Sequence, residues 1–254
     1  MVVIKSKMEL AIMRQAGRIN AQILAELREA ARPGVTTLEL NNLANRLLAK
    51  HNATPVFKGY HFNNGAPPFP ASITVCVNEE LVHGIPSHRR LREGDILSVD
   101  CGSYYKGYIG DSAFSVGIGK ISEEATRLLQ ITEQSLYVGI EQATVGNRVG
   151  DISAAIQDYV ERQGYNVVQG YGGHGVGRTM HEEPHVPNYG KPKHGMKLKP
   201  GLTLAIEPMV LQGAADVVVM PDQWTVVAKD GKLTAHFEHT VAVTEDGPEI
   251  LTLL

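Results

Sequence analysis

Four acidic residues in a repeated pattern are the first candidates for chemistry. The stretch LREGDILSVD, residues 91–100, ends at Asp100, and LKPGLTLAIE, residues 198–207, ends at Glu207. Both copies have the apolar run of a buried strand, and both predict that this strand stops on a carboxylate. Each terminal acid is followed further on by a second one, Asp111 and Glu238. The pattern therefore predicts two pairs of carboxylates.

All four carboxylates would meet if a pseudo-twofold axis relates the two copies. Carboxylates among apolar strands need compensation for the water that they lose. Protonation or pairing with arginine are alternatives, but these strands contain no arginine. Two divalent cations would offset four negative charges, and oxygen-rich ligation suits manganese, iron, cobalt or zinc. For one acid alone a solvated strand end is the simpler interpretation, whereas the duplicated set favours a metal centre.

Histidines stand between the two carboxylate pairs. The stretch GYGGHGVGRTMHEEPHVPNYG, residues 170–190, contains His174, His181 and His185, and its glycines let the backbone pack closely. His83 lies in NEELVHGIP. Any one of these histidines is more often a packing residue than a ligand. Their position relative to the acid pairs makes them candidates for metal binding or catalysis.

The predicted elements recur in the same order as the acids. Helical periodicity and capping signals predict helices over residues 8–31, 36–50, 122–143 and 151–163. Turns at Lys106–Gly107 and Asp230–Gly231 predict hairpins that bring each second acid back beside the first. Turn chemistry shared by two unrelated α/β segments is the alternative to an internal duplication. The joint recurrence favours one α+β domain over residues 1–254, with halves of about 1–120 and 121–254, its sheet inside and its helices outside.

Composition sets broad limits on function. The chain has 254 residues, of which 43% are hydrophobic and 20% are charged, and its net charge of −3 suggests neither nucleic acid nor a membrane as a global partner. The N-terminus lacks the apolar core of a signal peptide, and no run of about 18 apolar residues predicts a membrane span. Two cysteines are too few for a disulfide framework, so we expect a cytoplasmic protein.

The candidate residues match a known family. In order and spacing, the chain resembles the type I methionine aminopeptidases at their five metal ligands, Asp100, Asp111, His174, Glu207 and Glu238. The strings NEELVHGIP, GHGVGRTMHEEPHV, AIEPM and FEHTVAV match as well, and the resemblance covers essentially the whole chain. It implies the bacterial or organellar form and the pita-bread fold, with a central antiparallel sheet and outer helices.

The resemblance also implies an activity and a role for each residue. The activity is removal of the initiator methionine from nascent proteins whose second residue is small, by an enzyme with two divalent ions of cobalt, manganese, iron or zinc. Asp111 and Glu238 would bridge both ions, Asp100 would complete one site, and His174 and Glu207 would complete the other. The implied catalytic residues are His83, His181 and Glu207. The implied substrate-binding residues are Tyr60, Phe69, His83, His181 and Trp224, although core packing is an equal alternative for Tyr60 and Phe69.

Some positions depart from the family pattern. The loop Phe62–Pro68 is longer than in common bacterial members, Thr74 replaces a frequent cysteine, and His236 replaces a frequent glutamine. None of these changes removes one of the five ligands. We expect these changes to affect substrate range and metal preference.

Three further hypotheses concern the class of protein and its partners. A proline-specific aminopeptidase or prolidase would share the fold but usually has an additional N-terminal domain. A non-catalytic binding protein of this fold would have lost ligands, and all five are present. The lysines of GKPKHGMKLKPG form either a solvated loop, the simpler interpretation, or a contact with ribosomal RNA. These lysines are Lys191, Lys193, Lys197 and Lys199. The family resemblance favours a monomer.

Overall fold

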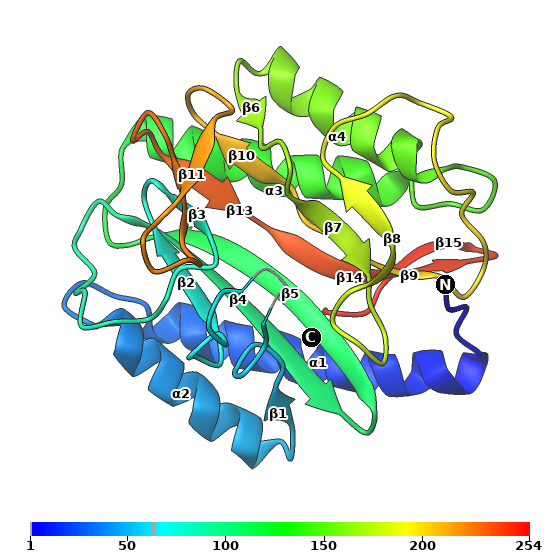
Figure 1. Cartoon of the computed structure of the whole chain (residues 1–254), viewed down its shortest axis with the longest axis horizontal. Helices are drawn as coiled ribbons and strands as arrows, with labels where there is room; N and C mark the ends of the chain where they lie inside the picture. Colours follow the sequence, from blue (N-terminus) through cyan, green and yellow to red (C-terminus); the bar gives the residue numbers. More distant parts are fainter. Residues whose placement is uncertain (1, 62–64) are drawn as a thin grey trace.

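A computed structural model gives the structure of the chain and describes residues 2–61 and 65–254 (Figure 1). Part of the unusual Phe62–Pro68 loop, at positions 62–64, thus lies outside the described residues. From Gly65 the chain continues to Phe69, whose side chain is buried. The end of this loop therefore leads directly into the core.

The two helices of the first half begin at capping boxes. Helix α1 spans Lys7–Ala30, and Ser6 and Glu9 satisfy each other's backbone N–H groups at its start. Helix α2 spans Thr37–Lys50, and Thr36 and Glu39 form the same arrangement. Such reciprocal bonds satisfy amide groups that have no partner within the first turn. Both predicted helices are confirmed to within one residue.

The second pair of helices repeats this order. Helix α3 spans Glu123–Glu141, and the Ser122 hydroxyl accepts the N–H of Ala125 at 3.1 Å. Helix α4 spans Val149–Arg162 and begins two residues earlier than predicted. Asp151 accepts the backbone N–H of Arg148 at 2.8 Å, so this acid is the third residue of the helix and not its first. The capping carboxylate lies inside the helix that it caps, and this explains the difference.

One antiparallel sheet of nine strands contains most of the candidate acids. Its order is β1-β4-β5-β14-β9-β7-β8, with β2 paired to β4 and β15 paired to β14. The strands are β1 (Thr54–Pro55), β2 (Thr74–Val77), β4 (Ile96–Tyr105), β5 (Tyr108–Gly117), β7 (Gly172–Gly175), β8 (Glu182–Pro187), β9 (Thr203–Ile206), β14 (Glu238–Thr244) and β15 (Gly247–Ile250). Strands from the two halves meet where β5 pairs with β14.

Two small sheets of three strands each lie beside the large one. Strand β10 (Met209–Leu211) pairs with β13 (Thr234–His236) and with β6 (Asn166–Val167). Strand β12 (Val226–Ala228) pairs with β11 (Val217–Val219) and with β3 (Glu80–Val82). Four of these six strands, β10 to β13, belong to the long excursion between Glu207 and Glu238.

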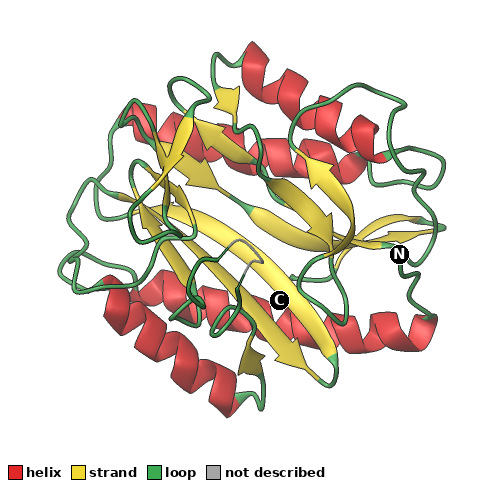
Figure 2. Ribbon diagram, viewed as in Figure 1, coloured by secondary structure: helices red, strands yellow, loops and turns green. Residues whose placement is uncertain are grey.

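The helices flank the sheet in two pairs. Figure 2 shows α1 and α2 along one side of the strands and α3 and α4 along the other. One cluster of buried apolar side chains joins both halves, with Ile23 and Leu97 from the first and Ile156 and Leu204 from the second. Within the described residues, no helix is both long enough and apolar enough to cross a membrane.

Candidate active site

The hairpin of β4 and β5 brings the first two acids together. Its turn lies at Lys106 and Gly107, both with positive φ, as the turn residues predict. Asp100 lies opposite Ala113, and Gly102 lies opposite Asp111. The two acids are therefore diagonal neighbours on one face of the hairpin.

The prediction that the first strand ends at Asp100 is wrong. Strand β4 runs on to Tyr105, and Asp100 lies in its middle. Pairing with β5 continues without a break from Ile96 opposite Gly117 to Tyr105 opposite Tyr108. The backbone hydrogen bonds of this ladder determine where the strand ends. A carboxylate on a side chain does not interrupt them. The second copy does end as predicted, because Glu207 directly follows β9.

The second pair of acids meets the first through β14. Glu238 at the start of β14 lies opposite Ala113 of β5, the residue that also lies opposite Asp100. On its other side β14 pairs with β9, where His239 lies opposite Ile206. Glu207, the next residue, follows at the end of β9. The four acids thus come from four strands that are neighbours in space.

His174 joins the acids from strand β7. Its Nε2 atom lies 3.8 Å from Oδ2 of Asp111 and 3.6 Å from Oε1 of Glu207. Ligand atoms of Asp111, His174 and Glu238 all lie within 4.8 Å of one another. Strand β7 pairs with β9, and this pairing places His174 opposite Ala205, two residues before Glu207. The Gly-rich segment therefore delivers its first histidine to the acids.

Three of the four carboxylates resist ionisation. Burial raises the pKa of Asp100 well above its usual value, and the neighbouring Asp111 raises it further. Burial likewise raises the pKa of Asp111 and of Glu238, and nearby carboxylates add to both increases. Low polarity and like charges both disfavour a second and third negative charge in one place.

The fourth carboxylate, Glu207, behaves in the opposite way. Burial alone would raise its pKa, but the imidazoles of His236 and His174 outweigh burial and lower it. Nε2 of His236 lies 3.6 Å from Oε2 of Glu207. In the sequence His236 stands out only as a departure from the family pattern. Its contact with a candidate ligand becomes visible only in the structure.

The donor set fits a divalent cation. Within the described residues, Oδ1 of Asp100 and both side-chain oxygens of Asp111 are buried without a hydrogen-bond partner. Buried carboxylate oxygens without a partner are costly, and a cation is the compensation that accepts several of them together with an imidazole nitrogen. The cluster of carboxylates and His174 is therefore compatible with a divalent metal.

The acids face a cavity of about 470 Å³. Asp100, Asp111, His174, Glu207 and Glu238 contribute to its lining. Apolar and aromatic side chains line it as well, among them Phe57, Tyr60, Phe69, Met180 and Trp224. The rings of Phe69 and Trp224 pack edge to face with centroids 5.1 Å apart, and Nε1 of Trp224 donates to the carbonyl of Pro67 at 2.9 Å. The cavity thus joins an acidic cluster to an apolar slot.

The two predicted catalytic histidines also line this cavity. Burial lowers the pKa of His83 to about 4, and burial together with His174 lowers the pKa of His181 to about 4. The ring of His181 lies 4.2 Å from that of His174, and its Nδ1 atom lies 2.6 Å from the hydroxyl of Tyr60. Both imidazoles are therefore neutral near pH 7 and able to donate one hydrogen bond each.

The remaining candidates lie at the edge of this site or away from it. His185 lines the cavity and lies opposite His174 on β8. Thr74 lines it as well and lies opposite Asp100. Lys191, Lys193, Lys197 and Lys199 do not reach the cavity and are exposed on the loop between β8 and β9.

Comparison with known proteins assigns the chain to a family. The model of metallopeptidase family M24 matches residues 11–245. A methionine aminopeptidase of Clostridium acetobutylicum is 54% identical, over 100% of this chain and 99% of its own length. Methionine aminopeptidase 1 of Bacillus subtilis is 52% identical, over 99% of each chain.

Solved structures agree with this assignment. The crystal structure of a methionine aminopeptidase from Thermotoga maritima superposes with a TM-score of 0.95 at 44% identity and covers 100% of both chains. An Xaa-Pro dipeptidase from Bacillus anthracis has a TM-score of 0.78 at 24% identity and shares the fold alone, with 98% of this chain matching 61% of that one. The pita-bread fold is thereby confirmed. The chain belongs to metallopeptidase family M24 and, within it, to the methionine aminopeptidases.

Proposed function

We propose that this chain removes methionine from the N-termini of nascent polypeptides whose second residue is small, by metal-dependent hydrolysis of the first peptide bond. The observation that carries this proposal is the junction of a buried acid and imidazole cluster with an apolar slot. The cluster suits a divalent metal, and the slot suits an unbranched thioether side chain.

Five residues would hold the metal. We propose two divalent ions of cobalt, manganese, iron or zinc, with Asp111 and Glu238 shared between them. Asp100 would complete one site, and His174 and Glu207 would complete the other. When bound, the ions supply Lewis acidity toward the scissile carbonyl and lower the pKa of water. The unpartnered oxygens of Asp100 and Asp111 support this assignment.

Glu207 is suited to proton transfer. Its lowered pKa keeps it ionised near pH 7, while its three acidic neighbours resist ionisation. An ionised carboxylate accepts a proton from the attacking water and returns it to the leaving amine. His236 and His174 hold Glu207 in this state, because their imidazoles favour its negative charge.

His181 and His83 are suited to act as neutral hydrogen-bond donors. The hydroxyl of Tyr60 and Nδ1 of His181 are 2.6 Å apart, and we propose that the hydroxyl is the donor, which would place the ring hydrogen of His181 on Nε2. That hydrogen would stabilise the negative charge that develops on the carbonyl oxygen. His83, whose ring lies 6.3 Å from that of Trp224, would orient the scissile peptide nitrogen.

The slot would hold the methionine side chain. Tyr60, Phe69 and Trp224 supply an apolar and aromatic lining, and the bond from Trp224 to the Pro67 carbonyl fixes the indole. A flexible thioether fills irregular apolar space and packs well against aromatic rings. Branched or charged first residues would fit this lining poorly.

Further proposals concern the whole protein. We propose that it acts in the cytoplasm as a monomer with one catalytic domain over residues 1–254, in halves of about 1–120 and 121–254. Buried free thiols at Cys76 and Cys101 support a reducing compartment, and the shared apolar cluster supports one domain. Contact with the ribosome through the four lysines remains a prediction.

One experiment tests the activity. Metal-stripped protein would be supplied with manganese, iron, cobalt or zinc and given Met-Ala-Ser, Met-Lys-Ser and Ala-Pro-Ser. We expect metal-dependent release of methionine from Met-Ala-Ser alone. Cleavage of only Ala-Pro-Ser would indicate a proline-specific enzyme. No cleavage by protein shown to contain bound metal would indicate a binding protein.

A further inference from the structure

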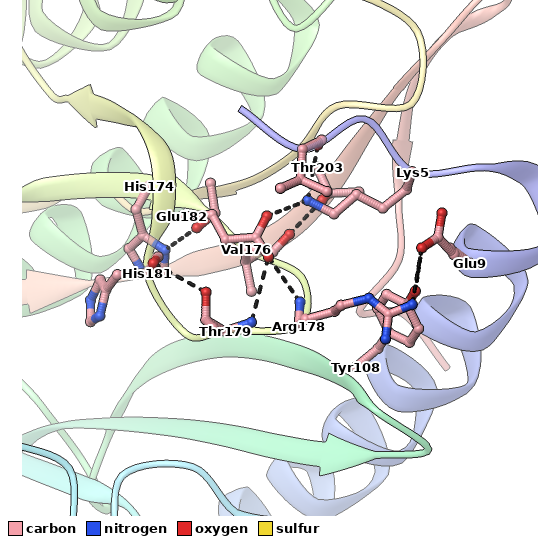
Figure 3. Close-up of polar contacts among 12 residues, drawn as sticks. Lys5, Glu9, Tyr108, His174, Val176, Arg178, Thr179, His181, Glu182 and Thr203 are labelled. Atoms are coloured by element: carbon pink, nitrogen blue, oxygen red, sulfur yellow. Dashed lines mark hydrogen bonds and ion pairs between the residues drawn. The ribbon is translucent and has the colours of Figure 1, made fainter. Parts of the chain in front are cut away.

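A buried ion pair joins the N-terminal segment to the turn that carries His181. Nζ of Lys5 lies 2.5 Å from Oε2 of Glu182, and both side chains are almost fully buried, with exposures of 1% and 7%. Nζ of Lys5 also donates to the carbonyl of Val3 at 3.2 Å. Lysine is almost never buried unless it has a partner. Figure 3 shows the pair immediately beside the turn between β7 and β8.

The second oxygen of Glu182 holds the backbone of this turn. Oε1 accepts the N–H of Arg178 at 2.9 Å and that of Thr179 at 3.5 Å. The hydroxyl of Thr179 donates to the carbonyl of His181 at 3.3 Å. Glu182 is thus bonded on one side to Lys5 and on the other to the residues that lead into His181.

The pair fits closely against the turn. A side-chain carbon added at Gly177 would come within 2.6 Å of both Cε of Lys5 and Oε1 of Glu182. The N–H of Gly177 donates to the carbonyl of Thr179 at 3.2 Å, which closes the turn. The absence of a side chain at Gly177 leaves room for the ion pair. Because the contact is close, a movement of either charged side chain would displace the backbone of the turn.

Lys5 is itself fixed to the strand that leads to Glu207. Its backbone N–H donates to the carbonyl of Gly201 at 2.8 Å, just before β9. In the same region the hydroxyl of Thr203 donates to the carbonyl of Val176 at 2.5 Å, at the start of the turn. The ion pair therefore links the turn of His181 to the strand of Glu207.

We propose that Lys5 and Glu182 are positioning residues for His181. They hold residues 177–181 in the conformation that places the His181 imidazole beside His174 and against the hydroxyl of Tyr60. Neither of the two lines the cavity of the acids, so both act through the turn and not on the substrate. A buried ion pair is weak evidence for net stability, since desolvation offsets its attraction. We therefore attribute the ion pair to the geometry of the turn, and not to a gain in the free energy of folding.

The test removes both charges at once. This inference rests on the proposed function, so the first requirement is metal-dependent methionine release by the unchanged enzyme. The double variant Lys5→Met with Glu182→Gln keeps side-chain volume and leaves no single buried charge. We expect kcat for Met-Ala-Ser to fall at least about tenfold, with KM changing less than about threefold, because misplacement of a group that acts in the transition state lowers kcat.

A second background separates positioning from general destabilisation. In protein that already contains His181→Ala, the same double variant should cause almost no further loss of kcat, because residues that act through one group are not additive. A loss of equal size in both backgrounds would overturn the proposal. So would an unchanged kcat in the active enzyme, and that result would leave the proposed function intact.

Two other variants complete the design. Glu182→Asp keeps both charges but shortens the reach to the amides of Arg178 and Thr179, so it serves if the double variant does not fold. It should reduce kcat and speed hydrogen exchange at these amides, and normal kcat with normal exchange would contradict the proposal. Arg14→Met is the matched control, because Arg14 forms an exposed ion pair with Glu249 at the same 2.5 Å separation. It should leave kcat unchanged.

Discussion

The two halves of the molecule supply two acids each, but the acids lie in different surroundings. In the first half Asp100 and Asp111 come from one tight hairpin, have unpartnered oxygens and have raised pKa values. In the second half Glu238 also has a raised pKa, but Glu207 lies beside His174 and His236, and its pKa is lowered. The long excursion between Glu207 and Glu238 replaces the tight turn of the first half.

This difference indicates a division of labour. Duplication of one strand arrangement places four carboxylates together. It does not decide which of them is ionised and can accept a proton from water. Neighbouring imidazoles decide this: His174 and His236 each lie 3.6 Å from Glu207, whereas among the described residues Asp111 has one imidazole in range, that of His174, at 3.8 Å and shared with Glu207. The hairpin of the first half thus provides carboxylates that would ionise when a cation offsets their charge, whereas Glu207 in the second half is an ionised base.

The largest expected effect comes from Asp111→Asn. This change removes a carboxylate that both proposed ions share, and Lewis acidity worth several kcal/mol is lost with the metal. We expect kcat/KM for Met-Ala-Ser to fall by roughly 10³-fold or more, together with lower metal content by elemental analysis. Full metal content with normal activity would refute the assignment of Asp111.

Glu207→Gln should distinguish most clearly between proton transfer by the second half and metal binding by the first half. General acid–base catalysis contributes at least about 10²-fold, so we expect kcat to fall by roughly that factor. Metal content should fall less than in Asp111→Asn, because Glu207 would complete only one of the two sites, whereas both proposed ions share Asp111. If the two variants lose metal and activity in parallel, Glu207 is only a ligand, and the proposed division of labour is wrong.

The sequence predicted the positions of these acids better than their charge states. The turn at Lys106–Gly107 and the repeated strand pattern are local signals, and they were sufficient to place Asp100 beside Asp111. The contact between His236 and Glu207 joins strands that the pattern does not align. The pair of Lys5 and Glu182 is separated by 177 positions, and a lysine near the start of a chain normally indicates a solvated residue. Tertiary contacts of this kind leave no periodic signal in the sequence.

Removal of the metal should reveal the raised pKa values as a dependence of stability on pH. In the unfolded chain these carboxylates ionise near pH 4, whereas in metal-free folded protein Asp100, Asp111 and Glu238 retain protons to higher pH. Both states are protonated below about pH 4, and the folded state loses stability as pH rises from there through the raised pKa values. For each such group the loss is about 1.4 kcal/mol per pH unit between its unfolded and folded pKa values.

Thermal unfolding at pH 5 and pH 8, with and without metal, measures this dependence. We expect the difference in Tm between metal-loaded and metal-free protein to widen as pH rises. Metal-free Asp111→Asn should lose less stability between the two pH values than the unchanged protein. Glu207→Gln should give less relief, because the pKa of Glu207 is itself lowered and its charge only adds to the raised pKa values of its three acidic neighbours. A similar response of both variants would remove the electrostatic contrast between the halves.

The apolar slot combines the halves in a different way. Phe69 comes from the first half and Trp224 from the second, and their rings pack together. We expect Phe69→Leu and Trp224→Phe each to raise KM for Met-Ala-Ser by roughly three- to tenfold with little change in kcat, because both remove uniform binding. Steady-state kinetics measure this, and a decrease confined to kcat would contradict a binding role.

The smallest effect concerns the basic loops that precede the two repeated strands. In the first half Arg89 pairs with Glu80 at 2.8 Å, and Arg90 donates to the carbonyl of Gly34 at 2.8 Å. In the second half the lysines at 191, 193, 197 and 199 are exposed, and across the described parts of the chain they form no ion pair. The second loop is therefore the better candidate for binding a polyanion.

Changing these four lysines to glutamine tests for contact with the ribosome. If they meet ribosomal RNA, the affinity measured by co-sedimentation falls, and the slope of its dependence on salt decreases by about one for each phosphate that the protein no longer neutralises. The matched control changes Lys7, Lys50, Lys106 and Lys120, which are exposed elsewhere, and alters net charge equally. Unchanged affinity in the loop variant, or an equal decrease in both, would reduce the loop to a solvated surface, and the two basic loops would then differ only in their internal contacts.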